Sequence, residues 1–230
     1  MIKKNRQKKK VFLVAAAGLV ATGVFVVFAM ASVHDISSTK DVTISGYDSP
    51  STRFNLESGM ALEAKDVNGD GNDDLFVGTH HGFPDGKETA GEAWITFGPL
   101  DQSAYDLADN SHYDIHIKDT IAGEHMSNSV TSGDINGDGV EDLILGAPYA
   151  SPSGKAQAGK SYVKFGPITA GTYSLPLDAD INLYGIDPDD RSGYSIDTGD
   201  LNNDGKTDMV IGARLSDPSG KSEAGETYVI

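Results

Sequence analysis

The sequence contains no cysteine, which excludes disulfide bonds, thiolate metal sites, cysteine catalysis and a lipid-modified cysteine anchor. Basic residues are also scarce: 18 Lys and Arg stand against 34 Asp and Glu, and the formal net charge is −16. Such a surface would repel the phosphates of a nucleic acid, so we expect no nucleic acid partner. After residue 31, no stretch keeps the 3.6-residue apolar period of an amphipathic helix, and we therefore expect an all-β fold.

The first 31 residues have a different composition. Residues 1–10 hold six Lys or Arg and no acid, and residues 11–30 are almost entirely apolar. Ala29-Met30-Ala31 then supplies the small-x-small pattern of a signal-peptidase site. We predict that residues 1–31 are a secretory signal peptide. The open alternative is an uncleaved membrane anchor over residues 11–30, since about 20 apolar residues suffice to cross a bilayer. Both place the protein outside the cell or at the cell surface.

The most informative feature of the chain is an acidic nine-residue pattern that occurs at 66–74, 134–142 and 200–208. Each copy has oxygen-bearing side chains at loop positions 1, 3, 5 and 9 and a glycine at position 6, where the chain must turn sharply. Position 7 varies in chemistry, as expected if only its backbone carbonyl is used. Such a loop suits Ca²⁺, which takes six to eight oxygen ligands. The predicted ligands are Asp66, Asn68, Asp70, Asn72, Asp74, Asp134, Asn136, Asp138, Val140, Asp142, Asp200, Asn202, Asp204, Lys206 and Asp208.

These loops differ from EF-hands, which require a bidentate Glu at position 12 and a following helix. Position 12 here is Val77, Leu145 or Ile211, inside an apolar run. We therefore predict about three Ca²⁺ ions bound in loops that join two strands. Because the loop oxygens would fill the ligand shell of the ion, its expected role is structural.

Short segments rich in Val, Ile, Phe and Tyr surround each loop in the same register. A strand is predicted just before each loop, another directly after it, and an aromatic strand follows a recurrent Gly at 91, 159 and 225. Further strands are predicted at 41–44, 114–117 and 180–183. Four-stranded repeats of this kind suggest the blades of a β-propeller, whose neighbours must stack to bury their faces.

The second copy, Gly133-Asp-Ile-Asn-Gly-Asp-Gly-Val-Glu-Asp-Leu-Ile-Leu-Gly-Ala-Pro148 with Lys164-Phe-Gly166, resembles the FG-GAP repeat. That repeat builds the N-terminal β-propeller of integrin alpha chains. The resemblance covers residues 41–230, although its Gly-Ala-Pro element is altered in the first and third copies. It implies a partial β-propeller of about three four-stranded FG-GAP blades, preceded by the N-terminal signal or anchor helix.

The resemblance also implies a ligand-binding face opposite the calcium loops. That face would be built from residues 79–90, 147–158, 213–224, 46–57, 118–127 and 184–192. Lys87, Lys155 and Lys221 recur at one place in it, which we interpret as a repeated turn on a solvated edge. The expected partner is an extracellular protein or glycan.

The last residue, Ile230, falls short of the Phe-Gly that ends the earlier copies, so we expect the propeller to be truncated at the C-terminus. There is no Gly-x-Ser-x-Gly nucleophile elbow. We interpret the glycine-rich stretches as lacking the Gly-Lys-Ser/Thr context of a phosphate-binding loop, and we expect no such loop. The pairs His80-His81 and His112 with His116 lack a third ligand, so we expect no metal site at either.

Two functions remain open from the sequence. The first is a secreted or cell-surface, Ca²⁺-binding, non-catalytic module for adhesion or ligand recognition. The alternative is the propeller part of a larger secreted hydrolase, similar to glycosylphosphatidylinositol phospholipase D, with its catalytic domain outside this chain. In neither case is this chain itself expected to be an enzyme.

Overall fold

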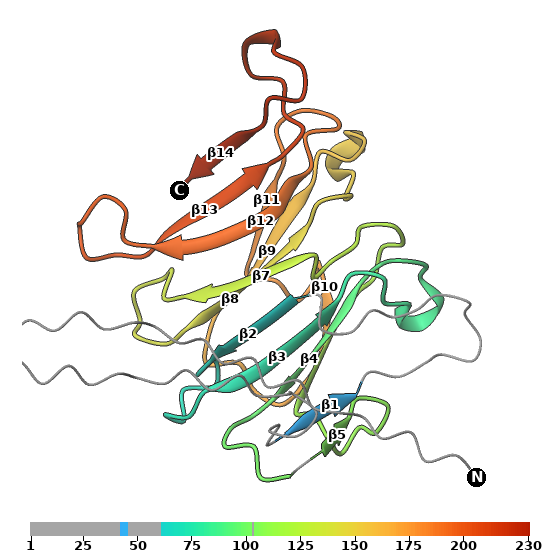
Figure 1. The fold of residues 1–230 in the computed structure, drawn as a ribbon, viewed down its shortest axis with the longest axis vertical. Helices are drawn as coiled ribbons and strands as arrows, with labels where there is room; N and C mark the ends of the chain where they lie inside the picture. Colours follow the sequence, from blue (N-terminus) through green and yellow to red (C-terminus); the bar gives the residue numbers. More distant parts are fainter. Residues whose placement is uncertain (1–41, 46–60, 103) are drawn as a thin grey trace, which may run out of the picture. The chain divides into compact units, whose positions relative to one another are not determined.

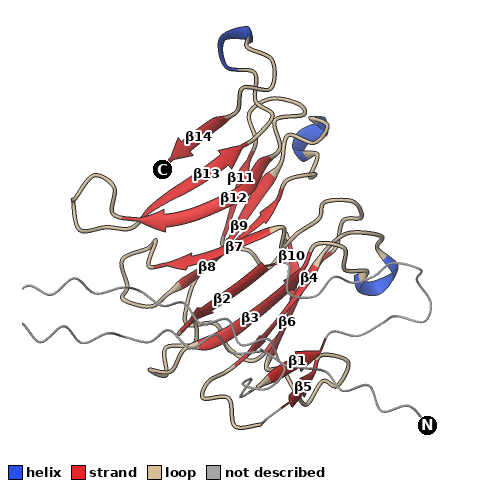
Figure 2. Cartoon of the chain, viewed as in Figure 1, coloured by secondary structure: helices blue, strands red, loops and turns tan. Residues whose placement is uncertain are grey.

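The computed structural model describes residues 42–45, 61–102 and 104–230, which belong to one compact unit spanning 40–230. Within these ranges the chain forms fourteen strands and three short 3-10 turns, and it contains no α-helix (Figure 2). The all-β prediction is confirmed. The predicted signal or anchor segment, residues 1–31, lies outside the described ranges. Among the residues that are described, no helix is long and apolar enough to cross a membrane.

The first sheet has the strand order β10-β6-β4-β3-β2 (Figure 1). β2, β3, β4 and β6 pair antiparallel in turn, and β10 adds to the outer edge of β6 in parallel. The first four are the strands predicted for the first repeat, whereas β10 was not predicted. Their bounds are β2 Ala61–Lys65, β3 Asp74–Thr79, β4 Glu92–Thr96, β6 Ile115–Asp119 and β10 Gly171–Leu175.

The second sheet repeats this arrangement with the order β11-β9-β8-β7, all antiparallel. The third sheet has the order β12-β13-β14. Both contain the strands predicted around their acidic loops. Their bounds are β7 Ser129–Gly133, β8 Asp142–Ala147, β9 Lys160–Lys164, β11 Ile181–Tyr184, β12 Ser192–Gly199, β13 Asp208–Ala213 and β14 Glu226–Val229.

The strand predicted at 41–44 corresponds to β1, Thr43–Ser45, which pairs in parallel with β5, Ala104–Asp106. The sequence did not indicate β5, because three residues with one buried tyrosine carry little periodicity. Leu107, directly after β5, packs with Val77 and Trp94 in a small apolar cluster against the first sheet. This two-stranded ribbon therefore covers part of the first sheet's outer face.

Neighbouring sheets contact each other in two ways: their innermost strands lie side by side, and their faces pack together. β7 lies between β2 and β12 (Figure 1). Leu143 and Leu145 of β8 face the first sheet in one core cluster, while the intervening Ile144 joins Met209 in a second cluster with the third sheet. Both faces of β8 are thus buried, which explains why Leu-Ile-Leu is a continuous apolar run and not an alternating one.

In the first two repeats, the recurrent glycine ahead of the aromatic strand has a steric cause. Gly159 has φ +88°, and a Cβ atom there would lie 2.1 Å from the carbonyl oxygen of Ser192, where β12 begins. Gly91 meets the carbonyl of Met126 at the same distance, ahead of β7. Only glycine lets the backbone of one sheet approach the start of the next sheet so closely.

Candidate functional site

The acidic loops lie where the sequence places them, between two neighbouring strands. Loop 66–74 joins β2 to β3, loop 134–142 joins β7 to β8, and loop 200–208 joins β12 to β13. Position 12 of each lies within the second strand of its pair. The prediction that each acidic loop joins two strands, with no helix following it as in an EF-hand, is confirmed.

Positions 1 and 3 of each loop bring two side-chain oxygens together. The backbone N–H of Asp138 donates both to Asp134 Oδ1, at 3.0 Å, and to Asn136 Oδ1, at 2.8 Å. Asp70 N–H makes the same pair of bonds in the first loop, at 3.1 and 2.8 Å, and Asp204 N–H makes them in the third, again at 3.1 and 2.8 Å. Two oxygens that share one donor lie close to each other, as two ligands of one cation must.

Position 5 points its carboxylate back into the same loop. Asp138 Oδ1 accepts the backbone N–H of Val140 at 2.9 Å, and Asp204 Oδ1 accepts that of Lys206 at 2.9 Å. In the first loop the backbone and side-chain N–H groups of Asn72 both donate to Asp70 and lower its pKa. All three loops therefore place a carboxyl oxygen at this position.

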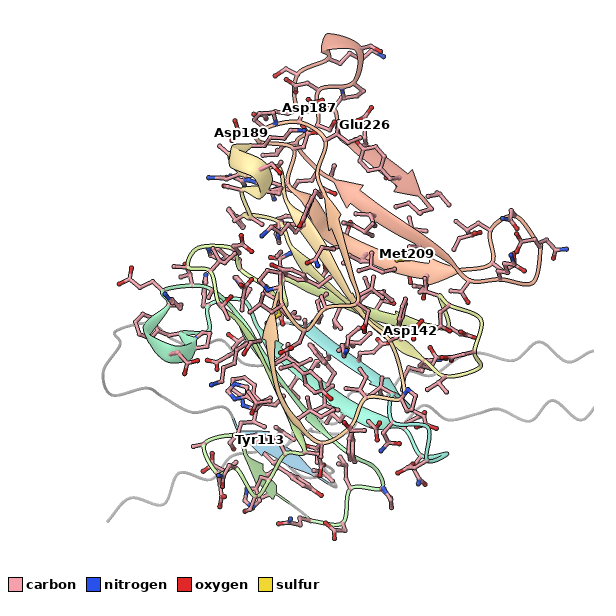
Figure 3. The ribbon with its side chains drawn as sticks, turned by 180° about the vertical axis from the view of Figure 1, so that it is seen from behind. Tyr113, Asp142, Asp187, Asp189, Met209 and Glu226 are labelled. Atoms are coloured by element: carbon pink, nitrogen blue, oxygen red, sulfur yellow. The ribbon has the colours of Figure 1, made fainter. Side chains whose placement is uncertain are left out.

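Position 9 has a second role that sequence reasoning missed. Asp142 is fully buried, and its Oδ2 accepts the backbone N–H groups of Ile135 and Asn136 while Oδ1 accepts that of Gly166 at 2.9 Å. Asp74 makes the matching bonds, including one from Gly98 at 3.0 Å. Burial raises the pKa of both carboxyls. Figure 3 shows Asp142 where the second loop enters β8.

The donor set fits a hard divalent cation. Each loop offers carboxylates at positions 1, 5 and 9, an amide oxygen at position 3 and a backbone carbonyl at position 7. The glycines at position 6 have φ between +83° and +91°, which provides the expected sharp turn. Each carboxylate oxygen carries two lone pairs, so Asp142 Oδ1 keeps one for a cation after accepting Gly166 N–H. Ions that prefer sulfur ligands are a poor match to this all-oxygen set.

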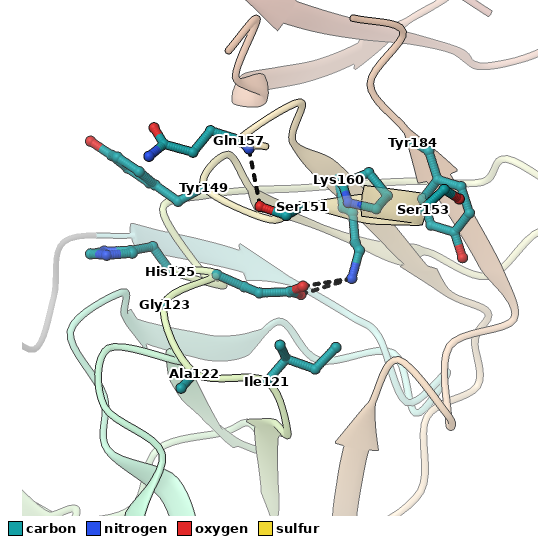
Figure 4. A pocket seen from close by; sticks show the side chains of 12 residues that line it. Ile121, Ala122, Gly123, His125, Tyr149, Ser151, Ser153, Gln157, Lys160 and Tyr184 are labelled. Atoms are coloured by element: carbon teal, nitrogen blue, oxygen red, sulfur yellow. Dashed lines mark hydrogen bonds and ion pairs between the residues drawn. The ribbon is translucent and has the colours of Figure 1, made fainter. Parts of the chain in front are cut away.

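A pocket of about 650 Å³ lies at the opposite ends of the strands (Figure 4). Its walls come from three loops and the adjoining strand ends, all within or next to the segments predicted to form the ligand face. They are Ile121, Ala122, Gly123, Glu124, His125, Tyr149, Ser151, Pro152, Ser153, Gln157, Lys160 and Tyr184. Because antiparallel strands alternate their loop ends, these residues lie on the far side from the acidic loops.

A buried polar network forms the floor of this pocket. Lys160 Nζ donates to both carboxylate oxygens of Glu124 at 2.7 and 2.9 Å, and Tyr162 Oη donates to Glu124 Oε2 at 2.7 Å. Asp119 lies beside them, 3.3 Å from Tyr162 Oη. Burial, together with the neighbouring Glu124 carboxylate, raises the pKa of Asp119 to about 8 and raises the pKa of Tyr162 as well.

Lys160 of this network also belongs to a stretch that resembles a phosphate-binding loop in sequence. Gly154 to Ser161 has the G-x-x-x-x-G-K-S spacing of a phosphate loop. A phosphate loop must end at the start of a helix, however, and here the stretch runs into strand β9. The Lys160 ammonium is already bound by Glu124. The interpretation that the glycine-rich stretches lack a Gly-Lys-Ser/Thr sequence is therefore wrong, and the evidence against a phosphate loop is the strand that follows Gly159.

Three histidines meet on the same face. His80 and His81 follow β3, and His125 reaches them from the loop before β7, so that one nitrogen of each lies within 4.8 Å of the others. Burial is the main cause that lowers the pKa of His125, to about 4, and the nearby His80 and His81 rings lower it further. The sequence did not connect His125 with this pair, because His125 lies more than forty residues after His81.

The three recurrent lysines end identical 3-10 turns, as the sequence indicates. The turns are Pro84–Gly86, Pro152–Gly154 and Pro218–Gly220. The backbone N–H of each lysine donates to the carbonyl of the turn's proline at 2.9 to 3.1 Å. The recurrence of lysine thus accompanies a repeated turn.

Comparison with known proteins agrees with these repeats. The FG-GAP repeat model matches residues 127–163 and 192–230. Integrin alpha-PS2 of Drosophila melanogaster is 27% identical over 199 residues, 84% of this chain and 13% of that protein. Integrin alpha pat-2 of Caenorhabditis elegans is 27% identical over 200 residues, 80% of this chain and 15% of that protein.

A second group of similar proteins consists of phosphatidylinositol-glycan-specific phospholipases D. Mouse phosphatidylinositol-glycan-specific phospholipase D is 35% identical over 104 residues, 44% of this chain and 12% of that protein. The chain thus spans less than a sixth of these three relatives. The two matched segments contain the second and third acidic loops with their flanking strands. Two segments of the chain therefore match the FG-GAP repeat, and most of its length is similar to integrin alpha chains.

Proposed function

We propose that this chain is a Ca²⁺-binding β-propeller module, non-catalytic, that serves adhesion or ligand recognition outside the cell or at its surface. The observation that carries the proposal is the shared geometry of the three acidic loops. In each, one backbone N–H holds the oxygens of positions 1 and 3 together, and a carboxylate at position 5 points back into the loop. When bound, Ca²⁺ would join those oxygens and so fix the connection between the two innermost strands of each blade.

The arrangement of the sheets supports the propeller part of the proposal. Three sheets of repeated order stack through β2, β7 and β12, as successive blades do around an axis. All three acidic loops lie at one end of these strands. The pocket and the histidine cluster lie at the other end, where loops from two neighbouring sheets meet.

Ligand recognition is proposed for that second face. The pocket combines aromatic walls, Tyr149 and Tyr184, with the polar side chains of Gln157 and Ser153. A concave site with aromatic walls and a few directed polar groups suits a protein side chain or a glycan. The buried Glu124–Lys160 ion pair lies at the floor of the pocket.

The alternative function is the propeller of a larger hydrolase, favoured by the 35% identity to a phosphatidylinositol-glycan-specific phospholipase D. In that case the catalytic groups would belong to another domain. The chain would still bind Ca²⁺ in the same loops, so calcium binding does not separate the two functions.

Calcium titration of the full chain tests the metal sites. Isothermal titration should give a stoichiometry of three Ca²⁺, and Asp138→Ala should reduce it to two. Position 9 is avoided in this test because its carboxylate also holds the fold. A stoichiometry of zero, or one left at three by Asp138→Ala, would contradict the assignment.

Adhesion and hydrolysis can be compared directly. Beads coated with the full chain should attach to a surface of extracellular proteins or glycans, and attachment should be lost with a chelator and with Tyr149→Ala. The exposed Asp73→Asn, on the opposite face and at a loop position that is not a predicted ligand, is the matched control. Release of a phosphatidylinositol-glycan-anchored reporter by the chain alone would overturn the non-catalytic part of the proposal.

A further inference from the structure

We propose that His80, His81 and His125 form a binding site for a transition-metal ion of the Zn²⁺ class, separate from the three acidic loops. One ring nitrogen from each lies within 4.8 Å of the other two. Their ring centroids are 4.0 Å apart for His80 and His81, 5.6 Å for His80 and His125, and 5.4 Å for His81 and His125. Three protein ligands are what zinc sites with one open position use.

Hydrogen bonds fix the backbone of the loops that carry the three histidines. Gly82 N–H donates to the carbonyl of Thr79 at 3.3 Å and closes the turn that carries His80 and His81. His125 N–H donates to the carbonyl of Thr89 at 3.0 Å, and the next residue, Met126, bonds the carbonyl of Ala90 at 2.8 Å. The loop before β7 is therefore tied to the loop before β4, so His125 is fixed opposite the histidine pair.

Comparison with the next repeat shows that the side chains, and not the backbone, make this site special. Arg191 occupies the place of His125, with φ +56° for both residues and the matching bond, from Arg191 N–H to the carbonyl of Gln157. Tyr149 occupies the place of His81, and the guanidinium of Arg191 lies 4.5 Å from its ring. In the second repeat, therefore, this place holds the guanidinium of Arg191 against the ring of Tyr149. In the first repeat it holds three imidazole rings.

His125 also shows an unused ligand atom. Its Nδ1 is buried and has no hydrogen-bond partner among the residues that the structure describes. A buried polar atom without a partner costs free energy, and a metal bond would remove that cost. The ring is held on its other side by Tyr149, whose ring centroid is 4.5 Å away.

The distances allow a tetrahedral ion after a small movement. Zinc bonds of about 2.0–2.1 Å place two nitrogen ligands about 3.3 Å apart. The three rings are half-buried, and their nitrogens need to close by about 1.5 Å at most, which rotation about the side-chain bonds can supply. Imidazole suits Zn²⁺, Cu²⁺ and Ni²⁺ better than Ca²⁺, which prefers oxygen, so the two kinds of site select different ions.

The test uses the full chain without a histidine tag, saturated with Ca²⁺ so that the acidic loops are filled. Zn²⁺ is titrated in competition with a chromophoric chelator, and Co²⁺ serves as the spectroscopic probe because tetrahedral Co²⁺ absorbs strongly in the visible. One Zn²⁺ should bind, and His80→Asn, His81→Asn or His125→Asn should each weaken binding at least tenfold. Asn is chosen at position 125 because it tolerates positive φ.

Two controls separate this site from the others. His112→Asn, which changes a histidine outside the cluster, and Asp138→Ala, which changes an acidic loop, should leave Zn²⁺ affinity within twofold of the parent. Equal Zn²⁺ affinity in the parent and in the triple His→Asn variant, or no Zn²⁺ binding by the parent, would overturn the proposal. Thermal unfolding of each variant in Ca²⁺ confirms that it is folded.

Discussion

At the scale of single residues, position 9 of the first two acidic loops combines two roles, because its carboxylate is a predicted cation ligand and also connects the loop to the rest of the sheet. Asp138 is exposed and its carboxylate bonds only within its own loop. Asp142 is fully buried and connects the loop to Gly166, at the end of the third strand of the sheet. Substitution of Asp138 should therefore weaken cation binding alone, whereas substitution of Asp142 should also lower the stability of the fold.

This difference can be measured. Asp142→Ala leaves the N–H groups of Ile135 and Gly166 without their acceptor, so the free energy of unfolding should fall by about 2–4 kcal/mol with or without Ca²⁺. Asp138→Ala should lower it only when Ca²⁺ is present. Denaturant unfolding in Ca²⁺ and in chelator distinguishes the two; equal losses for both variants in chelator would contradict the anchoring role.

Asp119 should give the protein a pH-dependent stability. Its folded pKa, about 8, is above the ordinary value of 3.8, so the folded state holds a proton that the unfolded state releases. The resulting stabilisation is complete below pH 4 and is lost as the pH rises to 8, by at most about 1.4 kcal/mol per pH unit. Asp119→Asn should flatten the dependence between these limits. An identical pH profile for parent and variant would show that Asp119 is charged in the folded protein.

At the scale of the element, the turns ahead of the first two aromatic strands decide how closely neighbouring sheets pack. Gly154 and Gly159 lie at either end of one such turn, with φ +82° and +88°. Only Gly159 faces another backbone, since no heavy atom lies within 4 Å of a Cβ built on Gly154. Substituting each glycine in turn therefore distinguishes two losses of stability: one from the positive φ alone, and one from a clash with the neighbouring backbone.

Gly154→Ala should cost about 1 kcal/mol, the penalty of a positive φ alone. Gly159→Ala adds a clash with the carbonyl of Ser192 and should cost about 3 kcal/mol or more, because β9 and the start of β12 must separate. Chemical denaturation of both variants provides the comparison. Similar losses for the two would mean that the second and third sheets can move apart freely at this point.

At the scale of the whole molecule, the three loops should make thermal stability depend on calcium. A ligand present at a hundred times its dissociation constant stabilises the folded state by about 2.7 kcal/mol per site. The melting temperature of the full chain should therefore fall by several degrees when a chelator replaces Ca²⁺. The same experiment with Mg²⁺ is the control, since Mg²⁺ requires a smaller, near-octahedral site. Equal melting temperatures in Ca²⁺ and chelator would contradict the structural role of the ion.

Local signals predicted most of the fold. The acidic loops, the strands on either side and the turns at Lys87, Lys155 and Lys221 all follow from short stretches of sequence with strong turn chemistry. The parallel additions β5 and β10 were missed, because their partners are distant in the sequence and their own patterns are short.

The site was predicted in part for the same reason. The predicted ligands of each acidic loop lie within nine consecutive residues, so their spacing could be recognised in the sequence. The pocket and the meeting of His125 with His80 and His81 depend on how two loops from different repeats are brought together. No spacing rule connects them, and only the register between sheets makes them neighbours.

The chain's single tryptophan, Trp94, is buried in β4 of the first sheet and stacks on His116 with ring centroids 5.2 Å apart. Its fluorescence therefore reports on one sheet of the three, whereas circular dichroism averages over all of them. Because repeated sheets contact mainly their immediate neighbours, they can unfold one after another. A melting curve followed by tryptophan emission and one followed by circular dichroism would coincide only if the stack unfolds as a single cooperative unit, which makes this one indole a built-in probe of cooperativity.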